Sequence, residues 1–330
     1  MNYSQSVATK CRAAQETGYL QGDQMESFRG FLRDLPFRIR DRVAMQPAVQ
    51  RALLPFGREL APDRWIFIIG CYNSGTTLLA NILRQHPLIG GLPTEGVYLS
   101  DVLPYPEKYG WPRNWAQCVD RVRLDPERDA NLADRIRRQW SIWAPTGRPN
   151  IVEKSIANAA RMPFLAAHFR PARFIYIVRN GYAVSAGIHR KANVSRWGGP
   201  YQGQRYPMEL CARQWRVSDE TVAADSLKIP HVLQIYYEDL VARPGEVLQG
   251  VTEFLGIPSL APEIVTRSWH VHGVVEPIRD MNEDVLGGLT DPEIEAIEKE
   301  AGARLAAHGY MTPRATTGHL ETESGMCQTG

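Results

Sequence analysis

The sequence predicts an α/β fold in which a central parallel sheet is flanked by helices. The first observation is that residues 66–81 pass from an apolar run, through a small turn bounded by glycines, into a helix-like pattern. The second is that strand-like and helix-like segments alternate after it, which is typical of a parallel sheet covered on both faces. With 330 residues, the chain is long enough for a single large domain.

The elements are expected in a regular order. Strands are predicted near 66–69, 87–92, 151–155, 173–179 and 231–240. Helices are predicted from residue 76 onward, in part of 116–143, at 162–169, over most of 181–228, and at 244–255 and 291–307. Each apolar run is short enough for a buried strand, whereas the longer segments have the spacing of an amphipathic helix.

Both ends of the chain differ from this pattern. Residues 1–60 are predicted to be a helical N-terminal extension, residues 61–312 the main domain, and the small, polar segment 313–330 a disordered tail. Within the extension, 25–57 combines helical spacing with many arginines. It either packs on the core as a solvated helix, which we favour, or makes a peripheral contact with a membrane.

The turn after the first strand has the spacing of a phosphate-binding loop, so the fold is P-loop-like. Gly70 and Gly75 are separated by four residues, and a helix follows. Bare N–H groups at the start of a helix bind anions. An ATP-type loop would continue with lysine, but here the next residues are Thr76 and Thr77. The loop therefore suits a group less charged than a polyphosphate.

This loop resembles the 5′-phosphosulfate loop of sulfotransferases that use 3′-phosphoadenosine 5′-phosphosulfate (PAPS). Four further segments are similar to that family: HPLIGGLPTEG at 86–96, FIYIVRN at 174–180, YEDLVARPGEVLQGVTEFLGI at 237–257 and LAAHGY at 305–310. The combination is most similar to bacterial-type members with a glutamate base, as in tyrosylprotein and several carbohydrate sulfotransferases. The resemblance implies that PAPS is the co-substrate, that no metal is needed and that a sulfuryl group moves in line to an acceptor.

The resemblance also assigns cofactor contacts to the loop. The N–H groups of Asn73, Ser74, Gly75, Thr76 and Thr77, with the threonine hydroxyls, would hold the 5′-phosphosulfate. Most family members have lysine or arginine where this chain has Asn73, so a cation must come from elsewhere. Our candidate is Lys154, which ends a strand-like run, because strand carboxyl ends are where ligands bind in open α/β sheets. Arg84 and Arg113 are the reserves.

Glu95 is the predicted catalytic base. It follows the second strand in the small-residue turn Thr94-Glu95-Gly96, which can present a carboxylate to a cleft. The matching position in the resembling sulfotransferases is a catalytic glutamate. The rival bases are His86 and His189, which we expect to be structural.

Arg179 is predicted to grip the 3′-phosphate of the cofactor. It ends a strand, and a guanidinium can bind a phosphate through two hydrogen bonds. The usual serine partner lies eight residues later, where this chain has Gly187, so we expect Ser185 to take that role. Arg279 and Asn282 lie before the last helix, on a loop that in the family often closes over the cofactor. Glu238 and Asp239 are expected to be structural.

The acceptor is expected to be a hydroxyl or amine of a small molecule, carbohydrate or lipid, and phenols and tyrosyl peptides stay open. An aromatic-rich region could line its cleft or belong to the core; its members are Tyr105, Tyr109, Trp111, Trp115, Trp140, Trp143 and Trp197. Residues 190–207, rich in glycine, arginine and aromatic side chains, are expected to gate the acceptor.

Composition narrows the functional class. A net charge of +2 gives no general affinity for nucleic acid. Five scattered cysteines without a CxxC pair argue against a disulfide framework or a zinc site. No segment has the apolar length of a secretory signal or a membrane span, so we expect a cytoplasmic protein. Two alternatives to a sulfotransferase are a nucleotide kinase or other phosphotransferase with an unusual loop, and a non-catalytic nucleotide-binding protein.

Overall fold

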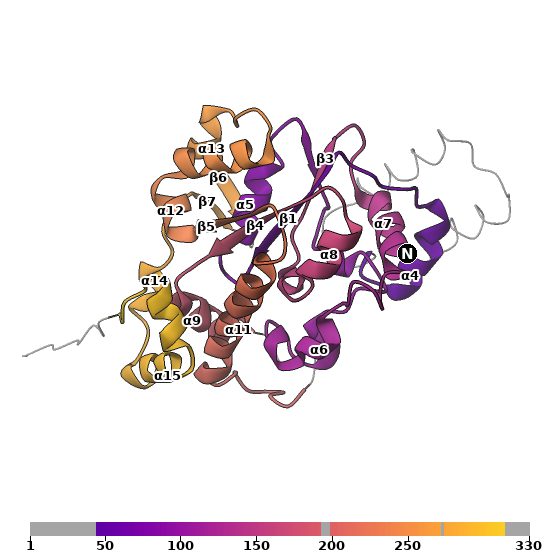
Figure 1. Cartoon of the computed structure of the whole chain (residues 1–330). Helices are drawn as coiled ribbons and strands as arrows, with labels where there is room; N and C mark the ends of the chain where they lie inside the picture. Colours follow the sequence, from indigo (N-terminus) through magenta and orange to yellow (C-terminus); the bar gives the residue numbers. More distant parts are fainter. Residues whose placement is uncertain (1–43, 193–198, 272–273, 314–330) are drawn as a thin grey trace, which may run out of the picture.

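A five-stranded parallel sheet forms the centre of the molecule (Figure 1). The computed structural model describes residues 44–192, 199–271 and 274–313. The strand order is β2 (Ile89–Gly91), β3 (Asn150–Glu153), β1 (Arg64–Gly70), β4 (Ala172–Val178) and β5 (Val232–Tyr236). The predicted α/β fold with a parallel sheet flanked by helices is therefore confirmed. The predicted N-terminal extension and C-terminal tail lie mostly outside the described residues.

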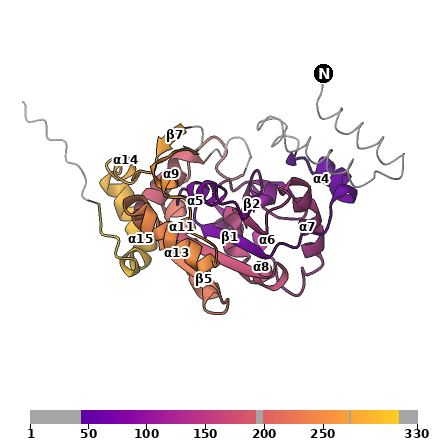
Figure 2. The ribbon, with the colours of Figure 1, turned by 90° about the horizontal axis from the view of Figure 1, so that it is seen from above.

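Helices surround this sheet (Figure 2). Their bounds are α4 Pro47–Leu53, α5 Thr76–Leu83, α6 Val119–Val122, α7 Leu132–Trp143, α8 Met162–His168, α9 Gly181–Lys191, α11 Met208–Ser226, α12 Tyr237–Ala242, α13 Pro244–Leu255, α14 Glu283–Leu286 and α15 Asp291–Ala307. The predicted helices at 244–255 and 291–307 are α13 and α15. Within the described residues, no helix is both long and apolar enough to cross a lipid bilayer.

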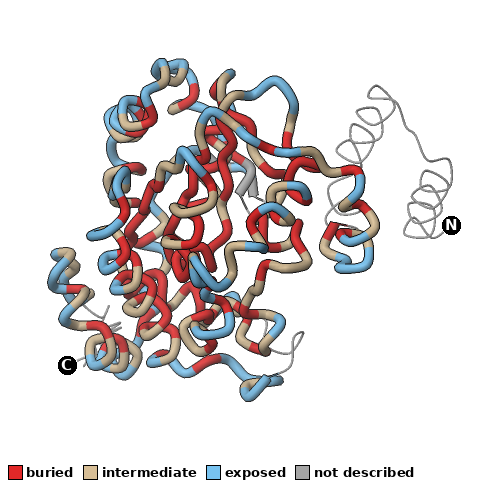
Figure 3. The backbone as a smooth tube through the Cα atoms, turned by 45° about the vertical axis from the view of Figure 1, so that its right-hand side comes forward, coloured by how far each residue is buried: buried red, intermediate tan, exposed pale blue. Residues whose placement is uncertain are grey.

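Side-chain alternation explains why both sheet faces are covered. In β1, Trp65 and Phe67 face one apolar cluster, which includes side chains of α7, α8, α11 and α15. Ile66 and Ile68 face a second cluster, formed with α5 and α13. All four side chains are at most 1% exposed, and burying each contributes roughly 1.5–3 kcal/mol. Figure 3 shows this buried core running through the central strands.

Local signals set where the helices near the site begin. The Asn180 side chain accepts hydrogen bonds from the N–H groups of Tyr182 and Ala183, so α9 starts immediately after β4. Gly75, at φ 88°, precedes α5 in the left-handed conformation that glycine adopts readily. The loop between α13 and α15 contains a two-stranded antiparallel pair that we did not predict, β6 (Ser268–Val271) with β7 (Val274–Pro277).

The strand order determines which residues meet. Strand β1 lies between β3 and β4 and runs parallel to both. The carboxyl ends of these three strands therefore share one edge of the sheet. Gly70 pairs with Ile177 and Phe67 with Glu153, so the loop after β1 lies between the residues that follow β3 and β4. Ligands bind at this edge in open α/β sheets.

Candidate active site

A cavity of about 470 Å³ opens at the carboxyl ends of the strands. Its lining includes four of the predicted loop residues, namely Asn73, Gly75, Thr76 and Thr77. It also includes Glu95, Lys154, Arg179 and Arg279, which come from different parts of the chain. The fold thus brings most of the predicted site residues to one place.

The conformation of the loop after β1 depends on residues with positive φ and on close packing. Asn73 has φ 62°, and Gly75 has φ 88°. A Cβ on Gly75 would lie 2.8 Å from Cδ2 of Tyr237, so the position needs glycine for both conformation and space. Ser74 is buried, and its hydroxyl has no hydrogen-bond partner among the described residues.

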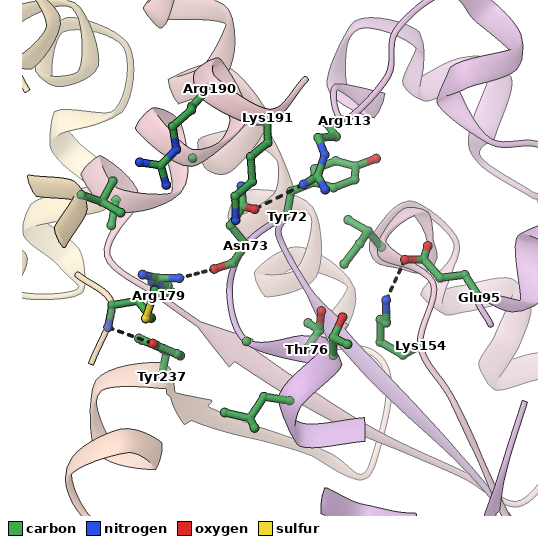
Figure 4. Close-up of a pocket in the computed structure, with 18 of the residues that line it drawn as sticks. Tyr72, Asn73, Thr76, Glu95, Arg113, Lys154, Arg179, Arg190, Lys191 and Tyr237 are labelled. Carbon is green, nitrogen blue, oxygen red and sulfur yellow. Dashed lines mark hydrogen bonds and ion pairs between the residues drawn. The ribbon is translucent and has the colours of Figure 1, made fainter. Parts of the chain in front are cut away.

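Glu95 and Lys154 form an ion pair at one side of the loop (Figure 4). Lys154 follows β3 directly, and Glu95 lies in the turn after β2. The Lys154 Nζ lies 2.6 Å from the Glu95 Oε1, and both side chains are largely shielded from solvent, with exposures of 12% and 23%. A carboxylate and an ammonium group therefore face the cavity together.

The buried side chain of Glu153 holds the turn that carries Glu95. The fully buried Glu153 carboxylate accepts a 2.7 Å hydrogen bond from the N–H of Gly96 and further ones from Ser155 and Asn158. Burial raises the pKa of Glu153, whereas the hydrogen bonds from Ser155 and Gly96 oppose that rise. On the other side of the turn, Trp140 donates to the carbonyl of Gly96 over 3.0 Å.

Arg179 lies on the opposite side of the loop from this ion pair, beside Tyr237 (Figure 4). Its guanidinium donates to the Asn73 carbonyl at 2.5 Å and to Asn282 Oδ1 at 2.8 Å. It also lies 4.2 Å from the centre of the Tyr237 ring. Burial lowers the pKa of Arg179, while nearby groups such as Glu238 raise it. Arg179 therefore connects the loop to the segment before α14.

Several predicted cofactor residues have other contacts. Ser185 is fully buried, and its hydroxyl donates to the Gly181 carbonyl at 2.6 Å within α9. Asn282 bonds to Arg179 and, over 2.9 Å, to Glu238. Neither Ser185 nor Asn282 belongs to the cavity lining among the described residues, whereas Arg279 does. Glu238 also accepts from the N–H of Asn180 at 3.0 Å.

Two positions at which the chain departs from the family pattern lie against each other. A Cβ on Gly187 would be 2.8 Å from Nδ2 of Asn73. That amide nitrogen is buried without a hydrogen-bond partner among the described residues, and Asn73 Oδ1 accepts from Arg113 at 3.2 Å. The glycine therefore leaves the space that the asparagine side chain occupies.

Sequence reasoning missed part of the cationic wall. Arg113, Arg190 and Lys191 line the cavity with Arg179 (Figure 4). Of the first three, only Arg113 had been named from the sequence, as a reserve source of the positive charge that Asn73 lacks. Burial lowers the pKa of Lys191, and the three arginines lower it further. The sequence pattern that could have identified Arg190 and Lys191 is helical spacing. These residues share one face of α9 with Ala183 and Gly187.

The rival bases and most of the tryptophans lie elsewhere. His86 contacts the Pro258 carbonyl at 3.0 Å, and His189 contacts the Tyr206 carbonyl at 2.8 Å. Trp115, Trp140 and Trp143 are buried in the core. Trp197 and part of the predicted gating segment 190–207 lie outside the described residues.

Polar and aromatic residues before Trp111 also line the cavity, and of these the sequence had suggested only Tyr105. Tyr98, Tyr105 and Glu107 line the cavity together with Tyr72 of the loop. Tyr98 ends the 3-10 helix η2 (Gly96–Tyr98), and Glu107 lies in the 3-10 helix η3 (Pro106–Tyr109). The rings of Tyr98 and Tyr105 are 5.2 Å apart at 77°, an edge-to-face arrangement. Only the aromatic content of this region had suggested an acceptor cleft.

Comparison with known proteins gives the same family as the sequence motifs. The chain is 28% identical over 223 residues to the nodulation protein NoeE of Sinorhizobium fredii, covering 60% of this chain and 52% of that protein. It is 26% identical over 206 residues to protein-tyrosine sulfotransferase 2 of Gallus gallus, covering 58% and 51% respectively. The chain thus spans about half the length of both relatives.

Solved sulfotransferase structures are also similar. The sulfotransferase domain from the curacin biosynthetic pathway has 20% identity and a TM-score of 0.46, covering 75% of this chain and 98% of that domain. A mouse sulfotransferase in complex with PAP has 16% identity and a TM-score of 0.44, covering 74% and 86%.

The family model described as the sulfotransferase family matches residues 65–262, which is more than half of the chain. That stretch contains the loop, the Glu95 turn, Lys154 and Arg179. The protein belongs to the sulfotransferase family.

Proposed function

We propose that this protein transfers a sulfuryl group from PAPS to a hydroxyl or amine of a small-molecule, carbohydrate or lipid acceptor, with Glu95 as the base. The observation that carries the proposal is the Glu95–Lys154 pair, 2.6 Å apart in the same cavity as the loop and Arg179. Proton removal and charge stabilisation are the two functions that in-line transfer requires.

The residues on the two sides of Asn73 suit a nucleotide with two anionic groups. The first turn of α5 offers N–H donors, and the buried Ser74 hydroxyl and the amide nitrogen of Asn73 lack partners among the described residues. Arg113, Arg179, Arg190 and Lys191 gather in one cavity, and their mutual repulsion is relieved when an anion binds. These observations support a cofactor with phosphate at both its 5′ and 3′ positions.

The chemistry divides between the donor and this chain's side chains. PAPS supplies the sulfuryl group, whose bond to the 5′-phosphate oxygen breaks as the bond to the acceptor oxygen or nitrogen forms. Glu95 takes the acceptor proton. Lys154 supplies a positive charge next to the loop, where Asn73 replaces the basic residue that is usual in the family, and so stabilises the departing phosphate.

The relatives limit the acceptor only broadly. One is named as a nodulation protein and another as a protein-tyrosine sulfotransferase. The second name points to a phenolic hydroxyl, so phenols are the first acceptors to test, beside the sugar hydroxyls that the sequence left open.

Nucleotide specificity tests the donor assignment. We expect 3′-phosphoadenosine 5′-phosphate (PAP) to raise the melting temperature, with a stabilisation of about 2.7 kcal/mol at one hundred times its Kd. ATP with Mg²⁺ and adenosine 5′-monophosphate should give much smaller shifts. An equal shift with ATP would favour a phosphotransferase, and the absence of a PAP shift would count against PAPS as the donor.

Glu95→Gln tests the base. We expect kcat to fall by roughly 10²–10⁴-fold, because the amide cannot accept the proton, while the PAP-induced shift persists. The matched control is Glu127→Gln, an exposed glutamate, which should leave both quantities unchanged. Full activity of the Glu95 variant would exclude Glu95 as the base, and an inactive wild-type protein that binds PAP would indicate a binding protein.

A further inference from the structure

The part of the cavity near Glu95 has aromatic walls and a second carboxyl group. Tyr72, Tyr98 and Tyr105 supply the rings, and Glu107 supplies the carboxyl. Glu107 interacts electrostatically with Glu95, Tyr72 and Tyr98, so all four lie close together. These residues come from three segments that join only in the folded protein: the loop, η2 with its preceding turn, and η3.

Glu107 differs from Glu95 in its surroundings. Glu95 is paired with Lys154, whereas no lysine or arginine in the described part of the chain forms an ion pair with Glu107. Two nearby cations have other contacts: Arg113 bonds to Asn73 Oδ1 and lies 5.8 Å from the Tyr72 ring centre, and Lys108 Nζ lies 4.7 Å from the Tyr105 ring centre. Burial and the charge of Glu95 raise the pKa of Glu107 to about 7, although its own N–H, the N–H of Arg113 and the charge of Arg113 oppose the rise. A negative charge here is poorly compensated by the protein.

Aromatic faces beside an uncompensated carboxylate suit a positively charged nitrogen. An acceptor with an anionic group at this place would be repelled by both Glu95 and Glu107. We propose that the acceptor carries an ammonium group near the hydroxyl to be sulfated, with Glu107 as its ionic partner and the Tyr98 ring as an aromatic wall. This inference rests on the proposed sulfotransferase function and narrows its acceptor class.

Three phenols that differ only in charge test this inference: tyramine (cationic), tyrosol (neutral) and 4-hydroxyphenylacetate (anionic). Turnover with PAPS and binding to the PAP-loaded protein are measured at pH 8 for wild type and Glu107→Gln. We expect tyramine to exceed 4-hydroxyphenylacetate by at least about tenfold in kcat/KM or affinity. Glu107→Gln should raise the KM for tyramine about tenfold, leave kcat nearly unchanged and spare tyrosol. For a sugar acceptor, 6-amino-6-deoxyglucose, which is largely protonated at pH 8, is compared with glucose and glucuronate.

The control variant Glu127→Gln, from an exposed position that is not part of the cavity lining, should keep the wild-type order. Equal values across both charge series, a preference for the anions, an order that Glu107→Gln leaves intact, or no binding of any of the six compounds would each overturn the inference. The PAP-induced thermal shift separates the two failures. If PAP stabilises the protein but no charge preference exists, only the acceptor inference fails; if PAP gives no shift, the donor assignment fails as well.

Discussion

At the scale of single residues, the cavity holds two glutamates with different environments. Glu95 has an ammonium group 2.6 Å away, whereas Glu107 lies among tyrosines and beside another carboxyl. Chemically identical groups in different environments have different pKa values and can therefore take different roles. We assign proton removal to Glu95 and acceptor binding to Glu107.

The raised pKa of Glu107 predicts a stability change with a defined sign. A carboxyl group whose pKa rises from 4.5 to about 7 on folding binds more protons in the folded state between these values, so the protein loses stability as the pH rises through that window. Glu107→Gln removes this loss. We expect the variant to be more stable than wild type by about 1–3 kcal/mol at pH 8 and by much less at pH 4.5. Melting curves at both pH values check this, and a variant destabilised at pH 8 would contradict it.

At the scale of elements, the loop between β1 and α5 depends on one glycine. In Gly75→Ala, the residue would keep a left-handed backbone conformation, and its Cβ would lie 2.8 Å from Cδ2 of Tyr237. Gly147 also has a positive φ, of 71°, but a Cβ there would meet nothing within 4 Å. We expect Gly147→Ala to cost only the backbone term, roughly 1–2 kcal/mol. Gly75→Ala should cost more and abolish the PAP-induced shift, because Tyr237 supports Arg179. Equal losses of stability with PAP binding intact would refute this.

A second prediction concerns the end of β3, which supports the Glu95 turn. In Glu153→Gln, an amide NH₂ group must face the donors that the carboxylate now accepts, and a buried unsatisfied group costs about 1–3 kcal/mol. We expect a lower melting temperature and, because the turn shifts, a kcat about tenfold lower with KM nearly unchanged. Steady-state kinetics separate positioning from stability alone. If only the melting temperature falls, Glu153 supports the fold and has no part in placing Glu95.

At the scale of the whole molecule, one buried aspartate connects three elements. Asp219 of α11 accepts hydrogen bonds from Tyr176 of β4 at 2.5 Å and from Arg304 of α15 at 2.6 Å, and contacts His308 at 2.9 Å. Burial alone would raise the pKa of Asp219, but the hydrogen bonds from His308, Tyr176 and Arg304 hold it below 3.8. Its stabilisation is therefore present above pH 3.8 and is lost as the pH falls through the lower, folded value.

Asp219→Asn should destabilise the protein by about 3–5 kcal/mol at neutral pH, because the cationic partner then lacks its counter-charge. The difference from wild type should shrink in acid. Asp239→Asn is the control, since the Asp239–Arg243 pair is exposed and contributes at most about 1 kcal/mol. Chemical denaturation at neutral and acidic pH measures both. A loss for Asp219→Asn no larger than for Asp239→Asn would show that this cluster does not hold α15 in place.

The fold was largely predictable because its signals are local. The apolar run before Gly70 and the helical spacing after Gly75 lie within a few residues of each other, and α13 and α15 matched their predicted bounds. The β6–β7 pair was missed, because its strands are only four residues long and we assigned no element to that stretch.

The site was predictable only in part, for a related reason. Residues directly after strands, such as Lys154 and Arg179, are visible in sequence, because a parallel sheet places strand ends at one edge. Lys191 and Glu107 follow no strand. Helical spacing places Lys191 on one face of α9, but tertiary contacts decide which face of α9 meets the cavity and where η3 packs.

The sequence by itself determined the strand–loop–helix unit, the alternation of strands with helices, and the family. These depend on backbone preferences and on contacts within short segments. Only the tertiary structure decided the order β2-β3-β1-β4-β5, the pairing of Glu95 with Lys154 and the burial of Glu107 without an ion pair to any described residue. Those features arise from contacts between residues far apart in the chain, whose free energies depend on burial and on neighbours that exist only after the sheet has formed.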